Sequence, residues 1–139
     1  DLQILQNRIL KMIFKLPILT HTKDLYEKYA KNVLPVMGII FKSLCMMVKK
    51  SLLEHDDALV HMEFLRSARV QKLKIKDYKS KFMSNDVEIA GAKIYNSLPN
   101  ELRTIESLNV FKSRLKSFLL SKSGSLSSIQ QLYTKNLII

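Results

Sequence analysis

The amino-acid sequence predicts a small, mainly α-helical domain with a short β-hairpin or extended arm around residues 70–88. Three observations support this fold class. Apolar residues recur at steps of three and four in several segments, as they do on one face of a helix. The chain has only three glycines and three prolines, so it has few breaks between elements. Apolar and basic residues alternate over residues 73–76, which is the pattern of a strand or an extended arm.

The first predicted element is an amphipathic helix that ends at Leu16, because the residue before a proline avoids helical geometry. A basic amphipathic segment also fits a surface-binding helix or a transit segment. We interpret it as a core-facing helix, since its apolar residues share one face: Leu2, Leu5, Ile9, Met12, Ile13 and Leu16. Thr22 is expected to cap a second helix over residues 23–32, with inward-facing Leu25, Tyr26 and Tyr29.

The third helix is expected to begin at Pro35, to run to about Leu53 and to form the centre of the core, because it is apolar on most sides. Cys45 lies within its apolar run and is expected to be a buried, unreactive thiol. A single cysteine excludes an intrachain disulfide and a cysteine-based zinc site, and it favours a reducing compartment. The apolar run of residues 33–48 is interrupted by Lys42 and is too short for a membrane span, so we predict no membrane partner.

The second half of the chain begins with an acidic loop, residues 54–57, followed by a helix or ordered connection over residues 58–69 and then by the extended arm. In the arm, residues 82–83 and Val87 are expected to form a second extended piece around a turn at residues 84–86.

Helical periodicity returns at residues 89–97 and is broken at Leu98–Pro99. Residues 100–103 predict one short turn. Leu98 and Leu102 are expected to pack this corner, and Asn96 and Ser97 to satisfy backbone groups at the end of the preceding helix. Ser107 is expected to cap a last helix that begins at Leu108 and ends at Ser121. Its apolar stripe comprises Leu108, Phe111, Leu115, Phe118 and Leu119. We therefore expect one helical domain over residues 1–120, followed by a flexible serine-rich linker and tail over residues 121–139.

The chain is strongly basic, since 23 Lys and Arg against 12 Asp and Glu give a formal net charge of +11. Such a surplus raises the local concentration of polyanions. Cations are densest over residues 66–81, where Asp77 is the only acid. Cations with an interleaved aromatic ring suit the phosphates and unpaired bases of RNA or single-stranded DNA. The predicted contacts are Arg66, Arg69, Lys72, Lys74, Lys76, Tyr78, Lys79 and Lys81.

Two smaller basic sets accompany this arm. One is formed by Lys112, Arg114 and Lys116 on the last helix, and the other by Arg8, Lys11 and Lys15 on the first. The alternative interpretation of all three sets is a solvated face that keeps the domain soluble. Binding through these sets would be electrostatic and non-specific.

Catalytic and metal-binding patterns are absent from the sequence. Asp56–Asp57 is the only adjacent aspartate pair, and it is interpreted as a solvated loop rather than a polymerase metal site. His21, His55 and His61 lack the mutual spacing of metal ligands. No glycine-rich phosphate loop or nucleophile motif occurs. We therefore predict a non-enzymatic chain with no cofactor and no metal.

Two stretches carry a family resemblance. Residues 91–103 read Gly-Ala-Lys-Ile-Tyr-Asn-Ser-Leu-Pro-Asn-Glu-Leu-Arg, and residues 107–116 continue with Ser-Leu-Asn-Val-Phe-Lys and Leu-Lys. Residues 2–10 read Leu-Gln-Ile-Leu-Gln-Asn-Arg-Ile-Leu, and residues 20–26 form a threonine-rich connection to Leu-Tyr. In this order and spacing they resemble the C-terminal region, beyond the polymerase core, of non-LTR (LINE-type, jockey-like) retrotransposon reverse transcriptases. The resemblance covers about residues 2–120.

The resemblance implies a non-catalytic accessory module of a protein whose whole would resemble an RNA-directed DNA polymerase. Its expected partners are RNA or DNA and the preceding reverse-transcriptase core, and its expected location is intracellular and nuclear. The sequence departs from the family at Tyr95, where Trp is common, and at residues 82–88, which are more acidic and less aromatic. The alternatives are a structural domain that packs on a polymerase core or another partner, and a non-functional retroelement remnant.

Overall fold

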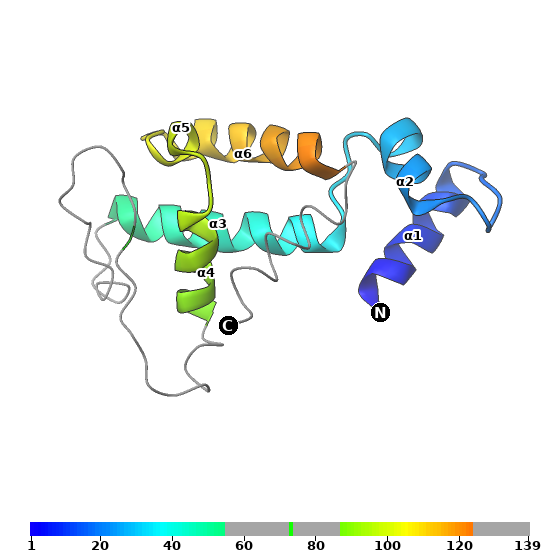
Figure 1. The fold of residues 1–139 in the computed structure, drawn as a ribbon, viewed down its shortest axis with the longest axis horizontal. Helices are drawn as coiled ribbons and strands as arrows, with labels where there is room; N and C mark the ends of the chain where they lie inside the picture. The colour runs from blue at the N-terminus through cyan, green and yellow to red at the C-terminus, as the bar shows by residue number, and fades with distance from the viewer. Residues whose placement is uncertain (55–72, 74–86, 124–139) are drawn as a thin grey trace.

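The computed structural model describes residues 1–54, 73 and 87–123, and this part of the chain is mainly α-helical, as the sequence predicts. In Figure 1 the long helix α3 is central, α6 lies along it, α4 crosses it, and α1 and α2 lie beyond one end. The elements are α1 (Leu2–Ile13), α2 (Thr22–Asp24), the π-helical η1 (Leu25–Tyr29), α3 (Val36–Glu54), α4 (Val87–Asn96), α5 (Asn100–Arg103) and α6 (Leu108–Ser123).

Helix α3 forms the centre of the main hydrophobic core and packs chiefly on α4 and α6. Its side chains Phe41, Cys45 and Val48 are fully buried. These positions recur at steps of four and three, so they form one face of the helix. The predicted central role of this helix and the predicted burial of Cys45 are both confirmed.

The crossing of α4 over α3 is close at Gly91. A Cβ atom at this glycine would lie 3.0 Å from Val48 Cγ2 and 3.4 Å from Met47 Cε. The two helices therefore approach with almost no space for a side chain at residue 91. The neighbouring residues Ala92, Ile94 and Tyr95 are buried in the same core.

The corner between α4 and α6 is built by Leu98 and Leu102, which are both buried, as the sequence predicts. Pro99 precedes α5, and its carbonyl accepts hydrogen bonds from the N–H groups of Leu102 and Arg103. Helix α6 starts at the residue after Ser107 and buries Phe111, Leu115 and Leu119, in agreement with the predicted stripe. The helix continues to Ser123, past the predicted end at Ser121.

Helix α1 forms where the periodicity predicts it, but its predicted orientation is wrong. The buried apolar residue of α1 is Leu10, which packs with Leu25, Tyr26 and Ala30 in a second cluster. The face toward the rest of the protein otherwise carries Gln3, Gln6 and Asn7, whose side chains hydrogen-bond to Tyr26 or to the start of α3. The predicted core-facing stripe is exposed: Leu2, Leu5, Ile9, Met12 and Ile13.

The predicted second helix is shorter and differently built. His21, rather than Thr22, occupies the N-cap of α2, and neither the predicted cap nor a substitute side-chain bond is present there. The chain then widens into η1, where the N–H of Ala30 donates to the carbonyl of Leu25 at 2.8 Å, an i to i+5 bond. Leu25 and Tyr26 are buried as predicted, whereas Tyr29 is exposed.

The predicted hairpin or arm lies mostly outside the described residues. Within residues 70–88 the structure describes Leu73, which is buried, and the start of α4. Val87 was expected in an extended piece but belongs to α4, because its helix starts two residues earlier than the apolar pattern indicates. The acidic loop beyond Glu54, the segment 58–69 and the tail from residue 124 also lie outside the described residues.

Candidate nucleic-acid interface

The eight predicted contacts of the basic arm lie outside the residues that the structure describes. They are Arg66, Arg69, Lys72, Lys74, Lys76, Tyr78, Lys79 and Lys81. The structure does describe Leu73, which sits in the middle of them and is the covalent neighbour of Lys72 and Lys74. The attachment of Leu73 to the core therefore fixes one point of the basic segment.

Leu73 is anchored by both its side chain and its backbone. The side chain belongs to the main core and is 3% exposed. The backbone N–H of Leu73 donates to Asn96 Oδ1 at 2.7 Å, and Asn96 Nδ2 donates to the Leu73 carbonyl at 2.8 Å. The side-chain amide thus pairs with the backbone as a neighbouring peptide group would. This pairing satisfies both backbone polar groups of a buried residue.

Asn96 is a functional candidate that the sequence interpretation assigned differently. Asn96 and Ser97 were both expected to satisfy backbone groups at the end of their helix. Ser97 does so, because its hydroxyl donates to the Ile94 carbonyl at 2.6 Å. Asn96 instead reaches Leu73, 23 positions away in the sequence. Its place in the Asn-Ser-Leu-Pro motif was the available signal, but its partner is set by tertiary packing.

Helix α6 contains more cations than any other described helix. Lys112, Arg114, Lys116 and Lys122 are all exposed, and the helix contains no Asp or Glu. Lys112 and Lys116 are four positions apart, a spacing at which like charges destabilise a helix. The exposed serines Ser117 and Ser121 donate to backbone carbonyls of their own helix, those of Ser113 and Phe118. Exposed cations on a helix without acids can bind phosphate groups.

Three other exposed lysines have acidic partners four positions away in the sequence. Lys23 lies 3.9 Å from Glu27, Lys28 lies 3.0 Å from Asp24, and Lys50 lies 3.7 Å from Glu54. All three pairs have i,i+4 spacing on exposed surfaces, where they reduce the local positive potential. The contrast with α6 indicates that the net charge is distributed unevenly over the described surface.

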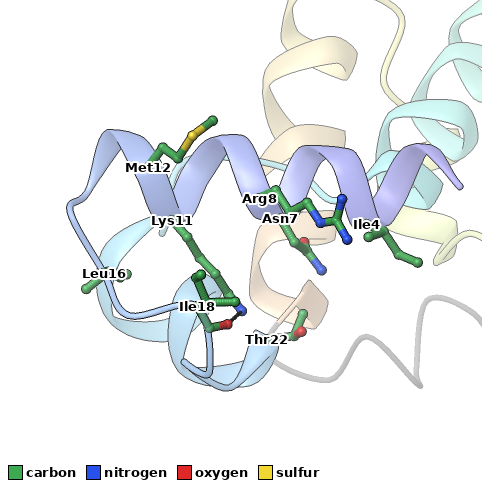
Figure 2. Close-up of a pocket in the computed structure, with 8 residues that line it drawn as sticks. All are labelled: Ile4, Asn7, Arg8, Lys11, Met12, Leu16, Ile18 and Thr22. Atoms are coloured by element: carbon green, nitrogen blue, oxygen red, sulfur yellow. Dashed lines mark hydrogen bonds between the residues drawn. The ribbon is translucent and has the colours of Figure 1, made fainter.

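The third basic set lies on α1 beside a pocket of about 580 Å³ (Figure 2). Lys11 Nζ donates to the Ile18 carbonyl at 2.6 Å, which joins the helix to the loop after it. Arg8 lines the same pocket, whereas Lys15 follows the end of the helix and has a left-handed backbone with φ 52°. The full lining is Ile4, Asn7, Arg8, Lys11, Met12, Leu16, Ile18 and Thr22.

Lys49, Tyr95 and Cys45 are ionisable residues that are buried in the main core or against it. Lys49 Nζ donates to the Arg103 carbonyl at 3.0 Å and lies 5.5 Å from the centre of the Phe111 ring. Burial lowers the pKa of Lys49, while nearby Glu106 raises it. Tyr95 donates to the same carbonyl at 3.3 Å. Burial raises the pKa of the Cys45 thiol, so this thiol stays protonated at neutral pH, as expected for an unreactive cysteine.

No group of His, Cys, Asp and Glu suited to a metal ion occurs among residues 1–54, 73 and 87–123. Asp56–Asp57, His55 and His61 lie outside these ranges, and His21 is exposed at the start of α2. None of the described helices is both long and apolar enough to cross a membrane.

Comparisons of the chain with protein-family models, with curated proteins and with solved structures gave no match. The resemblance to reverse-transcriptase C-terminal regions therefore stays a prediction from the motifs.

Proposed function

We propose that this chain is a non-catalytic accessory module of a retrotransposon-derived, reverse-transcriptase-like protein, and that it binds RNA or single-stranded DNA electrostatically. The observation that carries the proposal is helix α6, which has no acid of its own and has four exposed cations: Lys112, Arg114, Lys116 and Lys122. Lys112 and Lys116 lie one turn apart on the same side of the helix, so the helix holds these two charges at a fixed spacing for contact with phosphates. The predicted arm, residues 66–81, adds cations around the anchored residue Leu73.

The structure also gives the motif of residues 91–103 a structural role, which separates it from the proposed binding surface. Gly91 permits the α3–α4 crossing, Leu98 and Leu102 fill the corner, and Asn96 holds Leu73. These residues support the basic segments and α6. The phosphate contacts belong to exposed lysines and arginines.

The test is binding of the purified chain to fluorescent single-stranded RNA, single-stranded DNA and duplex DNA across a salt series. The first variant combines Lys112→Gln, Arg114→Gln and Lys116→Gln. If three phosphate contacts are lost, affinity for single strands should fall and the slope of log affinity against log salt should flatten by roughly two. A second variant, with Glu at Lys72, Lys74, Lys76 and Lys79, tests the arm and should weaken RNA binding further.

The matched control combines Lys23→Gln, Lys28→Gln and Lys50→Gln. It removes the same formal charge from the chain but takes it from lysines that already face acids. The control should bind almost as well as the original chain. Equal losses in the control and the α6 variant, or an unchanged affinity in both, would contradict the proposal and leave only the generic attraction of the net charge.

The alternative, an interaction domain that packs on a polymerase core or on another protein, has a different support. The apolar stripe of α1 faces solvent, although its residues are of the types that normally enter a core.

A further inference from the structure

The exposed stripe of α1 has the spacing of a helix-pairing seam. Leu2, Leu5, Ile9 and Met12 follow one another at steps of three, four and three, as the a and d positions of a heptad do. Their exposed fractions are 69%, 54%, 42% and 70%. We call these four residues the α1 seam. Few single helices of a monomeric protein leave a continuous apolar row of this length open to water.

The orientation of the seam is held by polar contacts on the side of α1 that faces Tyr26 and the start of α3. Tyr26 Oη donates to Gln6 Oε1 at 2.9 Å and to Asn7 Oδ1 at 3.0 Å. The N–H of Val36, the first residue of α3, donates to Gln3 Oε1 at 2.9 Å and to Gln6 Oε1 at 3.0 Å. A rotation of α1 that buried the seam would break this network and leave part-buried polar groups without partners, which is unfavourable.

The kind of partner follows from the spacing and the borders of the seam. The heptad spacing of the four residues matches a partner helix, Gln6 and Arg8 border the seam at mid-helix, and exposed Ile13 adjoins it at the end of α1. On the Arg8 side the surface continues to Lys11 and to the pocket, which the seam meets at Met12 (Figure 2). Helix α1 contains no Asp or Glu.

This charge distribution selects among helical partners. Pairing of two copies of the chain through the seam would bring together two molecules that each have a formal net charge of +11. Like charges beside a helix-pairing seam disfavour pairing, whereas opposite charges there set partner choice. A partner helix with acidic residues beside its apolar positions would match both the apolar seam of α1 and the positive charge next to the seam.

We propose that the α1 seam docks an amphipathic, acid-flanked α-helix of a partner protein. The proposal goes beyond nucleic-acid binding, because it concerns a different surface, and it specifies the partner chemistry of the alternative interaction-domain function. The seam supplies the apolar contacts, and exposed Arg8 beside it supplies the charge that selects an acidic flank.

The probe for the test is a synthetic four-heptad peptide with Leu at positions a and d and Glu at e and g. Its binding to the full chain is measured by fluorescence anisotropy, beside a peptide with Lys at e and g and a scrambled peptide of the same composition as the acidic one. We expect the acidic heptad peptide to bind and the other two to bind at least about tenfold more weakly.

Two variants locate the contact. Leu5→Ser combined with Ile9→Ser should reduce peptide affinity at least about tenfold while the folded helix content and the RNA affinity stay unchanged. Arg8→Glu should weaken the acidic peptide and strengthen the Lys peptide, which a structural role of Arg8 would not do. Leu10→Ala, which removes the buried apolar residue of the same helix, provides the reference for a variant that loses core packing.

Several results would overturn the proposal. Equal binding of the acidic and scrambled peptides would show attraction by charge alone. Seam-dependent binding to phosphatidylserine vesicles without peptide binding would assign the surface to lipid, and seam-dependent dimers in sedimentation would assign it to self-association. No binding in any arm, or unfolding by the double serine change, would show that the seam is not a docking surface. RNA affinity is measured on the same variants, so a failure of the proposed nucleic-acid binding can be distinguished from a failure of peptide docking on the seam.

Discussion

Asn96 shows how a single side chain can replace a stretch of backbone pairing. Its amide donates to one peptide carbonyl and accepts from one peptide N–H of Leu73, so it holds that residue as a neighbouring strand would. The sequence places Asn96 at a helix end, where amide side chains usually satisfy local groups. The sequence interpretation therefore predicted the right residue as important to the corner but could not predict a partner 23 positions away.

Asn96→Ala is expected to lower the free energy of unfolding by about 1–3 kcal/mol, because the N–H and carbonyl of buried Leu73 both lose their partner. Urea unfolding followed by circular dichroism measures this change. Asn109→Ala, an exposed asparagine on α6, is the control and should have little effect. If the two variants are equally stable, the paired hydrogen bonds do not anchor Leu73.

The Tyr95 hydroxyl is expected to make the free energy of unfolding decrease at alkaline pH. Burial raises the pKa of its hydroxyl to about 12, above its ordinary value of 10. The folded state therefore holds this proton more tightly than the unfolded state, and the resulting stability, on the order of 2 kcal/mol, is lost as pH rises from 10 through 12. In Tyr95→Phe this part of the pH dependence should disappear.

The measurement is the slope of unfolding free energy against pH between 10 and 12, rather than its absolute value. The slope reports the effect of Tyr95 deprotonation alone. The absolute free energy also includes the loss of the hydrogen bond from Tyr95 to the Arg103 carbonyl, which the variant lacks. Burial also raises the pKa of Tyr26, so some slope should remain in the variant. Tyr29→Phe, at an exposed tyrosine, is the control. An equal slope in the original chain and in Tyr95→Phe would contradict the assignment.

At the scale of elements, periodicity predicted the helices better than it predicted which side of each helix faces the core. Helix α3 is central to the core as predicted, and the predicted stripe of α6 faces the core, with Phe111, Leu115 and Leu119 buried and Leu108 and Phe118 half-buried. For α1 the same rule failed, since Gln3, Gln6 and Asn7 point inward and the apolar row points outward. A hydrophobic pattern reveals that a face needs a partner, but it does not reveal whether the partner lies in the same chain.

The α3–α4 crossing is the second element-scale feature, and it leads to a matched prediction. Gly91→Ala should be less favourable than Gly38→Ala by about 1–3 kcal/mol of unfolding free energy. Both changes gain helix propensity, but a Cβ at Gly91 meets Val48 Cγ2 at 3.0 Å, whereas at Gly38 the nearest atom, Leu34 Cβ, lies at an ordinary 3.5 Å. Thermal or urea unfolding of the two variants measures the difference. Equal effects at both glycines would show that the crossing tolerates a methyl group.

For the whole molecule, the sequence predicted a small, mainly helical fold and a basic character, and the structure confirms the fold class over the described residues. The candidate binding surface was predicted only in part. The α6 cations were expected off the apolar stripe and are exposed there, whereas the arm cations lie outside the described residues. The contrast between α6 and the acid-paired lysines of α2, η1 and α3 depends on which residues share a surface, and composition alone does not contain that information.

The capping of α3 by glutamines from α1 has a consequence for how the chain folds. The first N–H of α3 finds its acceptors on Gln3 and Gln6, 33 and 30 positions earlier, rather than on a local capping residue. The amino end of the central helix is therefore completed only when α1 has docked. The small cluster around Leu10 and the large core around Phe41 are thus coupled, so loosening the first should fray the helix on which the second is built. The coupling between the small cluster and the main core therefore involves two uncharged amide side chains, in a chain whose formal net charge is +11.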